Sequence, residues 1–207
     1  MTPPILKSVT RTQGNNSALK DGEIKLPGFS FDFVEIPVLN NAFRRMVRTL
    51  EFDVCEMALT TYLCAREHGV KFTAIPIFLK RAFHHGIIVH NTERPIKDPK
   101  QLEGTYVGIN RGYTVTAGVW ARGILEEEYG VDLKKITWVL SGDEHVSEYK
   151  APKNVITKNT NQTLEDALLS GDLSAAINIQ TDDSRIESLI PNALNRGLAA
   201  FSNRGHY

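Results

Sequence analysis

The chain of 207 residues is long enough for one sizeable domain or two small lobes. Its 24 basic and 24 acidic side chains cancel, which argues against a nucleic-acid-binding surface, because such surfaces carry a basic excess. Hydrophobic residues make up 42% of the chain, but no run approaches the ~18 apolar residues of a membrane span. We therefore expect a globular protein with no nucleic-acid and no membrane partner.

The N-terminal sequence and the cysteine content both favour a cytoplasmic protein. The N-terminus has no basic segment followed by an apolar stretch, so the sequence shows no secretory signal. Cys55 and Cys64 are the only cysteines, and they do not form a CxxC pair. A reducing compartment suits them, and we expect both to be small core residues.

The first eighty residues alternate between strand and helix patterns. Phe43 and Met46 recur at helical spacing after Asn40 and Asn41, two residues that favour a helix start. A second helical pattern ends at Gly69. Strands are predicted around these helices at residues 5–12, 31–36, 52–56 and 72–78.

The alternation continues to residue 180. A long helix is predicted from Thr114 to Tyr129 before Gly130, and a shorter one, capped by Thr163, ends before Gly171. Strands are predicted near residue 87 and over residues 106–109, 136–139 and 175–179, with a weak helix at 185–190. This order predicts an α/β fold with mostly parallel sheets.

Loops at residues 91–99 and 141–161 interrupt the pattern and divide it into two lobes. We predict that residues 1–85 plus 181–207 form the first lobe. Residues 86–180 then form the second lobe and include the strands that cross between the lobes. Ligands of open α/β sheets sit outside the C-terminal ends of strands, so these ends are expected to surround a cleft.

Two adjacent histidines and an arginine lie between two apolar runs, in Arg81-Ala82-Phe83-His84-His85-Gly86. Histidine changes its charge near neutral pH, so the group predicts a site that holds an anion and moves a proton. Adjacent side chains of an extended segment point to opposite faces, so only one of His84 and His85 then faces a cleft. Alternatively, the group finishes a strand and bonds loop carbonyls.

A glycine-containing turn enters the long predicted helix at residues 110–116. The helix start offers free N–H groups, Thr114 and Thr116 offer hydroxyls, and Arg111 offers a cation. This combination suits a carboxylate without any metal. The alternative is ordinary helix capping by Thr114 and a solvated Arg111.

Other polar residues give weaker signals. Thr60 and Tyr62 follow the third strand and form either a second rim of the site or a helix cap, and Glu144-His145 is typical of a solvated loop. No HExxH or His-x-His spacing is present, so we predict no metal. The nucleotide and serine-hydrolase motifs GxGxxG, P-loop and GxSxG are also missing from the sequence.

Several segments resemble the 4,5-dihydroxyphthalate decarboxylase family and related solute-binding-protein-like sequences. The more specific ones are Arg81-Ala82-Phe83-His84-His85-Gly86 and Thr116-Ala117-x-x-Trp120-x-Arg122-Gly123. The resemblance covers roughly residues 31–207 and implies a two-lobed type II periplasmic-binding-protein fold. Together with the residues above, it implies catalytic roles for His84 and His85. The implied substrate-binding residues are Arg81, Tyr62, Thr60, Arg111, Tyr113, Thr114 and Thr116.

The chain departs from that family in two ways. Members usually continue past the position of Tyr207, so the fold is expected to be C-terminally short, with the first lobe incomplete. Apolar faces that include Phe43, Met46 and Leu50 would then lack some of their cover, and we expect a homo-oligomer, aggregation or easy melting. The Asn110-Arg111-Gly112 turn also differs from the family pattern.

The leading prediction is a cofactor-free carboxy-lyase that acts on a hydroxylated aromatic carboxylic acid such as 4,5-dihydroxyphthalate. A general acid protonates the ring carbon that bears the carboxylate, and carbon dioxide leaves. The alternative is a solute-binding protein that delivers a small aromatic or carboxylate ligand to a transporter. A third hypothesis is a fragment or degenerate homologue without activity.

Overall fold

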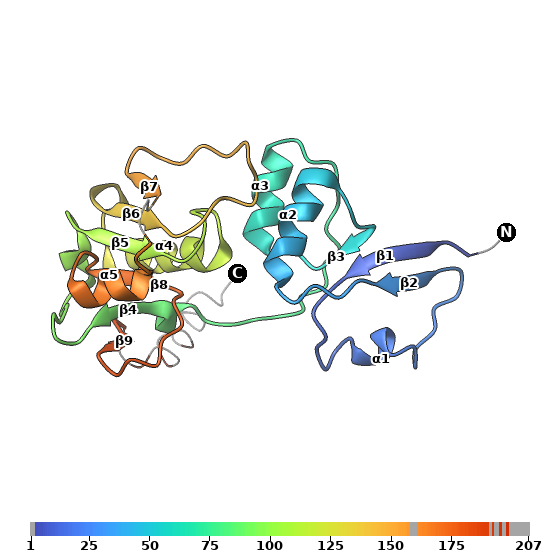
Figure 1. Ribbon diagram of the computed structural model, residues 1–207, viewed down its shortest axis with the longest axis horizontal. Helices are drawn as coiled ribbons and strands as arrows, with labels where there is room; N and C mark the ends of the chain where they lie inside the picture. The colour runs from blue at the N-terminus through green and yellow to red at the C-terminus, as the bar shows by residue number, and fades with distance from the viewer. Residues whose placement is uncertain (1–2, 158–160, 191, 193–194, 196–197, 199–207) are drawn as a thin grey trace. The chain divides into compact units, whose positions relative to one another are not determined.

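The computed structural model describes residues 3–157, 161–190, 192, 195 and 198 (Figure 1). It holds two separate β-sheets with α-helices packed on them, which confirms the predicted mixed α/β class. The chain divides into two compact units. Unit 1 comprises Met1–Lys80 and His145–Tyr149, and unit 2 comprises Arg81–Glu144 and Lys150–Tyr207.

Unit 1 is built on a parallel sheet of three strands in the order β2-β1-β3. The strands are β1 (Ile5–Val9), β2 (Ser30–Phe33) and β3 (Val54–Cys55). The helices are the short α1 (Ser17–Lys20), α2 (Leu39–Thr49) and α3 (Leu59–Glu67), of which α2 and α3 pack together beside the sheet (Figure 1).

Helix α2 shows how the sequence builds this unit. Its buried residues recur every three or four positions, so they form one apolar face against the sheet, while arginines occupy the other face. The helix begins at Leu39, one residue before the predicted start at Asn40, and no side chain caps it. It ends at Thr49, and the C-cap residue Leu50, with a φ of 51°, turns the chain out of the helix.

Unit 2 is built on a six-stranded sheet in the order β7-β6-β5-β8-β4-β9. Four strands are parallel: β5 (Tyr106–Ile109), β6 (Thr137–Leu140), β7 (Val155–Thr157) and β8 (Ala175–Ile177). Strand β4 (Ile88–Asn91) is antiparallel to β8 and to β9 (Ile186–Ser188). Three short 3₁₀ helices join these elements: η1 (His85–Ile87), η2 (Pro99–Leu102) and η3 (Leu133–Lys135).

Helices α4 (Thr116–Tyr129) and α5 (Leu164–Ser170) cover opposite faces of this sheet. Val107, Ile109 and Trp138 belong to the apolar cluster with α4, whereas the intervening Val139 belongs to the cluster with α5. The alternation follows from the two-residue period of a strand. Gly108 faces α5 so closely that a Cβ would lie 2.8 Å from Leu173 Cδ1, which explains a glycine within a buried strand.

Three predicted elements differ in the structure. Residues 72–78 form no strand, and Ile75, Ile77 and Phe78 are about two-thirds exposed, at 65%, 66% and 65%. Pro76 lacks an N–H for a ladder, and the Ile77 N–H instead bonds Ile75 O at 2.8 Å. The first strand ends at Val9 rather than at residue 12.

The third difference concerns residues 185–190, where a weak helix was expected. Residues 186–188 instead form β9, which pairs with β4 and so extends the sheet of unit 2. The prediction that residues 181–207 complete the first lobe falls largely outside the described residues after position 190. The division at residues 85 and 180 therefore stays a prediction beside the two units.

Two further features bear on function. Within the described residues, no helix has the length and apolar character needed to cross a bilayer. Cys55 and Cys64 are free thiols that are only partly buried. Burial, and next the charge of Glu56, raises the pKa of the Cys55 thiol to about 12, so this thiol stays protonated at neutral pH.

Candidate functional site

The parallel strands of unit 2 end together at one polar edge. Asn110, Ser141 and Asn178 directly follow β5, β6 and β8. Asn110 Nδ2 donates to Asn178 O at 2.8 Å, Ser141 Oγ donates to Asn110 Oδ1 at 3.3 Å, and Arg111 N donates to Ser141 Oγ at 2.9 Å. These bonds hold the edge rigid at the position where open α/β sheets bind ligands.

A cleft of about 430 Å³ opens at this edge. Its lining combines the apolar Leu164 and Ile179 with polar residues, which include Asn110, Ser141, Gln162, Thr163, Glu165 and Gln180. Among the lining residues that the structure describes, Glu165 is the one with a charged side chain. Amides, hydroxyls and a carboxylate accept and donate hydrogen bonds, so this cleft suits the hydroxyl groups of a ligand better than its carboxylates.

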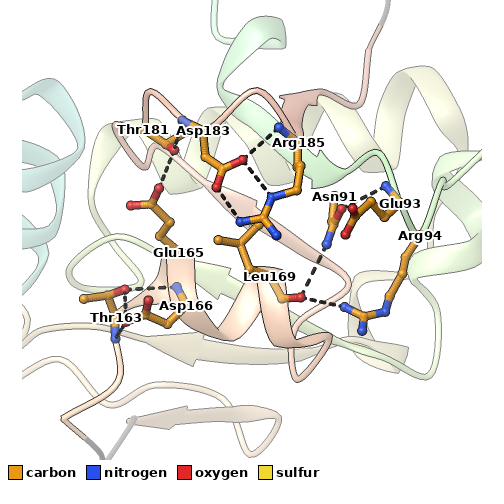
Figure 2. Close-up of polar contacts among 10 residues, drawn as sticks. All are labelled: Asn91, Glu93, Arg94, Thr163, Glu165, Asp166, Leu169, Thr181, Asp183 and Arg185. Atoms are coloured by element: carbon orange, nitrogen blue, oxygen red, sulfur yellow. Dashed lines mark hydrogen bonds and ion pairs between the residues drawn. The ribbon is translucent and has the colours of Figure 1, made fainter.

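Helix α5, which forms one wall of the cleft, is fixed at its start (Figure 2). Asp166 N donates to Thr163 Oγ1 at 3.0 Å, and Thr163 N donates to Asp166 Oδ2 at 3.2 Å, which confirms the predicted cap. Thr181 Oγ1 donates to Glu165 Oε1 at 2.5 Å. The Glu165 carboxylate therefore has a defined direction.

The far end of α5 is fixed as well, as Figure 2 shows. Leu169 O accepts from Arg94 Nη1 at 2.8 Å and from Asn91 Nδ2 at 3.5 Å. Beside it, hydrogen bonds from the Arg185 guanidinium hold the pKa of Asp183 at about 2. One wall of the cleft is thus a helix that is fixed at both ends.

The predicted anion-binding turn before α4 already holds a carboxylate of the chain itself. Glu144 accepts from Tyr113 N, from Thr114 N at 3.1 Å and from Thr114 Oγ1 at 2.5 Å. Gly112 is needed here, since a Cβ would lie 2.7 Å from Glu144 Oε2. A second anion at the same donors would meet the charge of Glu144.

Helix α4 therefore begins differently from the prediction. It starts at Thr116 instead of Thr114, and its N-cap residue, Val115, makes no side-chain cap. Arg111 adopts a φ of 75°, a left-handed conformation that aims the turn toward Ser141. Thr114 acts as an anchor for Glu144, and its role as a substrate ligand stays a prediction.

Tyr113 is held by a buried cation. The Arg122 guanidinium lies 3.6 Å from the centre of the Tyr113 ring and 5.8 Å from that of Trp138, and only 7% of Arg122 is exposed. Such stacking is stronger where water is excluded. The ring of Tyr113 therefore contributes to the packing of α4 on the sheet.

The two adjacent histidines meet different surroundings on α4. His85 is buried, and its Nε2 lies 3.1 Å from Glu128 Oε2 and 3.2 Å from Oε1. His84 is half-buried and stacks on Trp120, with ring centres 6.2 Å apart and planes 17° apart. Trp120 is 48% exposed, so His84 lies nearer to solvent than His85 does.

Helix geometry relates His84 to the start of α4. Thr116 and Trp120 are four residues apart in the helix and therefore lie on one face. The stacked His84 consequently lies on the same face as Thr116, about one turn further along. Arg81, three residues before His84, is exposed. Of the predicted site residues, His84 and Thr116 thus share one face of α4, and their roles and that of Arg81 stay predictions.

Thr60 and Tyr62 belong to unit 1. Both are half-buried on α3, whose N-cap Ala58 makes no side-chain cap. The Tyr62 ring packs edge-to-face on Phe72, with centres 5.3 Å apart. Their roles as substrate ligands stay predictions.

His145, expected in a solvated loop, is buried in unit 1 and only 1% exposed. Its Nδ1 lies 2.9 Å from Thr61 Oγ1, and its carbonyl accepts from Arg48 Nε at 3.0 Å. Neither Glu144 nor His145 is the free polar residue that the loop prediction implied. Among the residues that the structure describes, no group of three His, Cys, Asp or Glu side chains could hold a metal ion.

Sequence reasoning missed a second cleft, of about 290 Å³, at the corresponding edge of the unit 1 sheet. Thr10, Arg11 and Thr12 line it directly after β1. They were hidden within the predicted strand 5–12. The change from apolar to polar residues after Val9 was the signal that could have revealed them.

Comparisons with known proteins give the sequence identity and the length of the resemblance. No family model matches the chain. It is 34% identical over 167 residues to 4,5-dihydroxyphthalate decarboxylase of Pseudomonas putida, an alignment that covers 77% of this chain and 64% of that protein. The corresponding enzyme of Comamonas testosteroni is 32% identical over 167 residues, with 77% of this chain and 50% of that protein covered.

The chain resembles 4,5-dihydroxyphthalate decarboxylase. This bears out the resemblance found in the segments around His84 and Trp120. The chain spans 64% and 50% of the two decarboxylases that it matches.

Solved structures show the fold. The alkanesulfonate-binding protein SsuA from Xanthomonas axonopodis pv. citri, bound to MOPS, matches with a TM-score of 0.53 at 15% identity, covering 86% of this chain and 55% of that one. The periplasmic aliphatic sulphonate-binding protein SsuA from Escherichia coli matches with a TM-score of 0.53 at 14% identity, covering 84% and 50%. The predicted periplasmic-binding-protein-like fold is confirmed.

Proposed function

We propose that this chain is part of a carboxy-lyase that removes carbon dioxide from a hydroxylated aromatic dicarboxylate such as 4,5-dihydroxyphthalate. The observation that carries the proposal is the 34% identity over 167 residues to a decarboxylase of that substrate. The chain covers part of that enzyme, so activity, substrate and partners are all proposed here. We place the reaction in the cytoplasm and propose that the protein forms a homo-oligomer.

The chemistry asks for a proton donor and for groups that position the ring. A hydroxyl para to the leaving carboxylate pushes electron density onto the carbon that bears it. A proton added to that carbon forms a C–H bond, and the C–C bond to the carboxylate then breaks and releases carbon dioxide. No electrons pass to or from another group, so the proposed step needs no redox cofactor. Positioning and general acid catalysis suffice.

His84 is our choice of proton donor. A general acid must come within hydrogen-bond reach of the substrate carbon, and the half-buried His84 on the exposed Trp120 is better placed for this than the buried His85. His85, with its Nε2 against Glu128, then orients the segment that carries His84. His85 is in this view a positioning residue.

The remaining predicted residues supply binding groups in the proposal. Arg81 and Arg111 offer guanidinium groups for carboxylates, and Thr116 offers a hydroxyl on the face of α4 that carries Trp120. Tyr62 and Thr60 would bond a ring hydroxyl. The uncharged amides of the unit 2 cleft favour hydroxyl groups in the same way.

Carbon dioxide release from 4,5-dihydroxyphthalate by the purified protein tests the proposal. We expect His84→Asn to lower kcat by about 10²- to 10⁴-fold with a nearly unchanged Kd, because a general acid acts mainly in the transition state. His85→Asn should retain more activity. Full activity in both variants would remove the histidines from the mechanism. Tight binding without release in the unaltered protein would instead favour a solute-binding role.

A further inference from the structure

The C-terminal edge of the unit 1 sheet carries a cation that the proposed reaction has not used. Strands β1, β2 and β3 are parallel, so their carboxyl ends meet at one edge. The loop after β1 supplies Arg11, flanked by Thr10 and Thr12, and Glu35 follows β2. These residues line the cleft of about 290 Å³, which lies wholly within unit 1.

The backbone of this loop is fixed on one side by an acidic residue and an amide. Glu56 Oε2 accepts from Thr10 Oγ1 at 2.8 Å and from Arg11 N at 3.0 Å. Asn16 Nδ2 donates to Arg11 O at 2.9 Å. Both peptide groups of Arg11 are therefore tied down, which sets the direction in which its side chain leaves the loop.

Lys20 fixes the loop from the other side. Its side chain is only 6% exposed, and Nζ donates to Thr10 O at 3.1 Å, to Thr12 Oγ1 at 2.8 Å and to Glu35 Oε1 at 2.6 Å. Three contacts use all three donors of the ammonium group. A buried, fully bonded lysine is more than an ordinary surface turn requires, and it makes the loop a preorganised platform.

The charges around the cleft leave Arg11 available for a ligand. Glu56 is engaged by the loop and Glu35 by Lys20. Within the described part of the chain, the exposed Arg11 guanidinium has no hydrogen-bond or ion-pair partner. Thr12 Oγ1 accepts from Lys20, so its own hydroxyl proton remains to be donated.

We propose that Arg11 and Thr12 form a carboxylate-binding subsite for an aromatic acid. A guanidinium pairs with a carboxylate through two parallel hydrogen bonds, and a neighbouring hydroxyl adds a third donor. The volume of about 290 Å³ lies near the lower end of small-molecule sites, which suits a single-ring acid. This inference deepens the proposed function, on which its choice of ligand rests.

The test is calorimetric titration with phthalate, a dicarboxylate without hydroxyl groups. We expect Arg11→Gln to raise the Kd about 10- to 100-fold, the range of a lost charged hydrogen-bonding partner. Arg11→Lys should fall between, since lysine keeps the charge but not the two-pronged geometry. Lys71→Gln, at an exposed position in the turn after α3, removes the same formal charge and should leave the Kd unchanged.

The outcomes separate this subsite from the proposed reaction. If carbon dioxide release fails but Arg11→Gln weakens phthalate binding, the reaction is wrong and the subsite stands. If release succeeds and Arg11→Gln leaves both Kd and KM unchanged, the reaction stands and the subsite is refuted. Equal weakening by Lys71→Gln, or no phthalate binding by the unaltered protein, also overturns the subsite.

Discussion

The carboxyl ends of the parallel strands form a polar edge in each unit, and the two edges differ in which donors an internal carboxylate leaves available to a ligand. In unit 2, the turn before α4 is filled by Glu144, whose carboxylate accepts from Tyr113 and Thr114. In unit 1, Glu56 and Lys20 form hydrogen bonds with the loop after β1, and Arg11 of this loop lines a cleft.

A group of hydrogen-bond donors that suits an anion can already be occupied by a carboxylate of the same chain. The donors before α4 have the composition of a carboxylate site, but the chain satisfies them internally. In the loop after β1, Glu56 accepts from the Thr10 hydroxyl and the Arg11 N–H, so the Arg11 guanidinium remains available to a ligand.

Removing the internal carboxylate should destabilise unit 2. Glu144→Ala leaves the N–H groups of Tyr113 and Thr114 without their acceptor, and we expect a loss of about 2–3 kcal/mol in the free energy of unfolding. Trp120 and Trp138 are the only two tryptophans and both belong to unit 2, so tryptophan fluorescence in urea reports this unit.

Glu126→Ala provides the matched control, because Glu126 is exposed on α4 and should change stability by less than about 0.5 kcal/mol. Millimolar phthalate should recover part of the stability of Glu144→Ala by binding to the released donors. A stable Glu144→Ala variant that ignores phthalate would break the contrast between the two edges.

A methyl group at position 112 should have the next largest effect. In Gly112→Ala the new Cβ would lie 2.7 Å from Glu144 Oε2 and 2.9 Å from Asp143 O, so we expect a loss of about 1–2 kcal/mol. The same urea titration measures it. Gly123→Ala, where nothing lies within 4 Å of the new Cβ, is the control and should not destabilise α4.

Loosening the unit 1 loop should weaken ligand binding without touching unit 2. Lys20→Met removes the three donors that hold Thr10, Thr12 and Glu35, and we expect the Kd for phthalate to rise about 3- to 10-fold. The unfolding curve seen by tryptophan fluorescence should stay the same. An unchanged Kd would show that Arg11 does not depend on the platform.

Acid should lower the stability of unit 2 by a smaller amount. Burial lowers the pKa of His90 in the folded chain, against the opposing charge of Glu187, so the unfolded chain binds the proton more readily. The stability of unit 2 should therefore fall as the pH drops below about 6.5, the unperturbed value. His90→Asn should flatten this dependence in urea titrations followed by tryptophan fluorescence between pH 5 and 7.

The sequence predicts elements whose signals are local. Thr163 and Gly171 bracket α5 because a capping side chain and a left-handed residue act within one turn. The pattern of α2 predicts its buried face for the same reason. Segments 72–78 and 185–190 fail because pairing partners decide them: the first has none in a sheet, and the second finds β4 about ninety-five residues earlier.

In the candidate site too, local features are predictable from the sequence, whereas contacts between distant residues are not. The turn at residues 110–116 is identifiable from its residue types, but Glu144 fills it from thirty residues away, a contact that no local spacing encodes. The exposure of His84 and the burial of His85 depend on α4, which lies more than thirty residues later. Arg11 was hidden because strand patterns do not mark where pairing stops.

The return of residues 145–149 to unit 1 has a consequence for synthesis on the ribosome. His145 and Val146 complete the surroundings of Thr61 and Ala65, yet they are translated after strands β4, β5 and β6 of unit 2. Strand β4 likewise waits for β9. Neither unit closes its core from a continuous stretch of nascent chain, so both depend on contacts between distant residues, which form slowly. A chaperone that shields the unpaired strand edges during elongation should therefore raise the yield of folded protein.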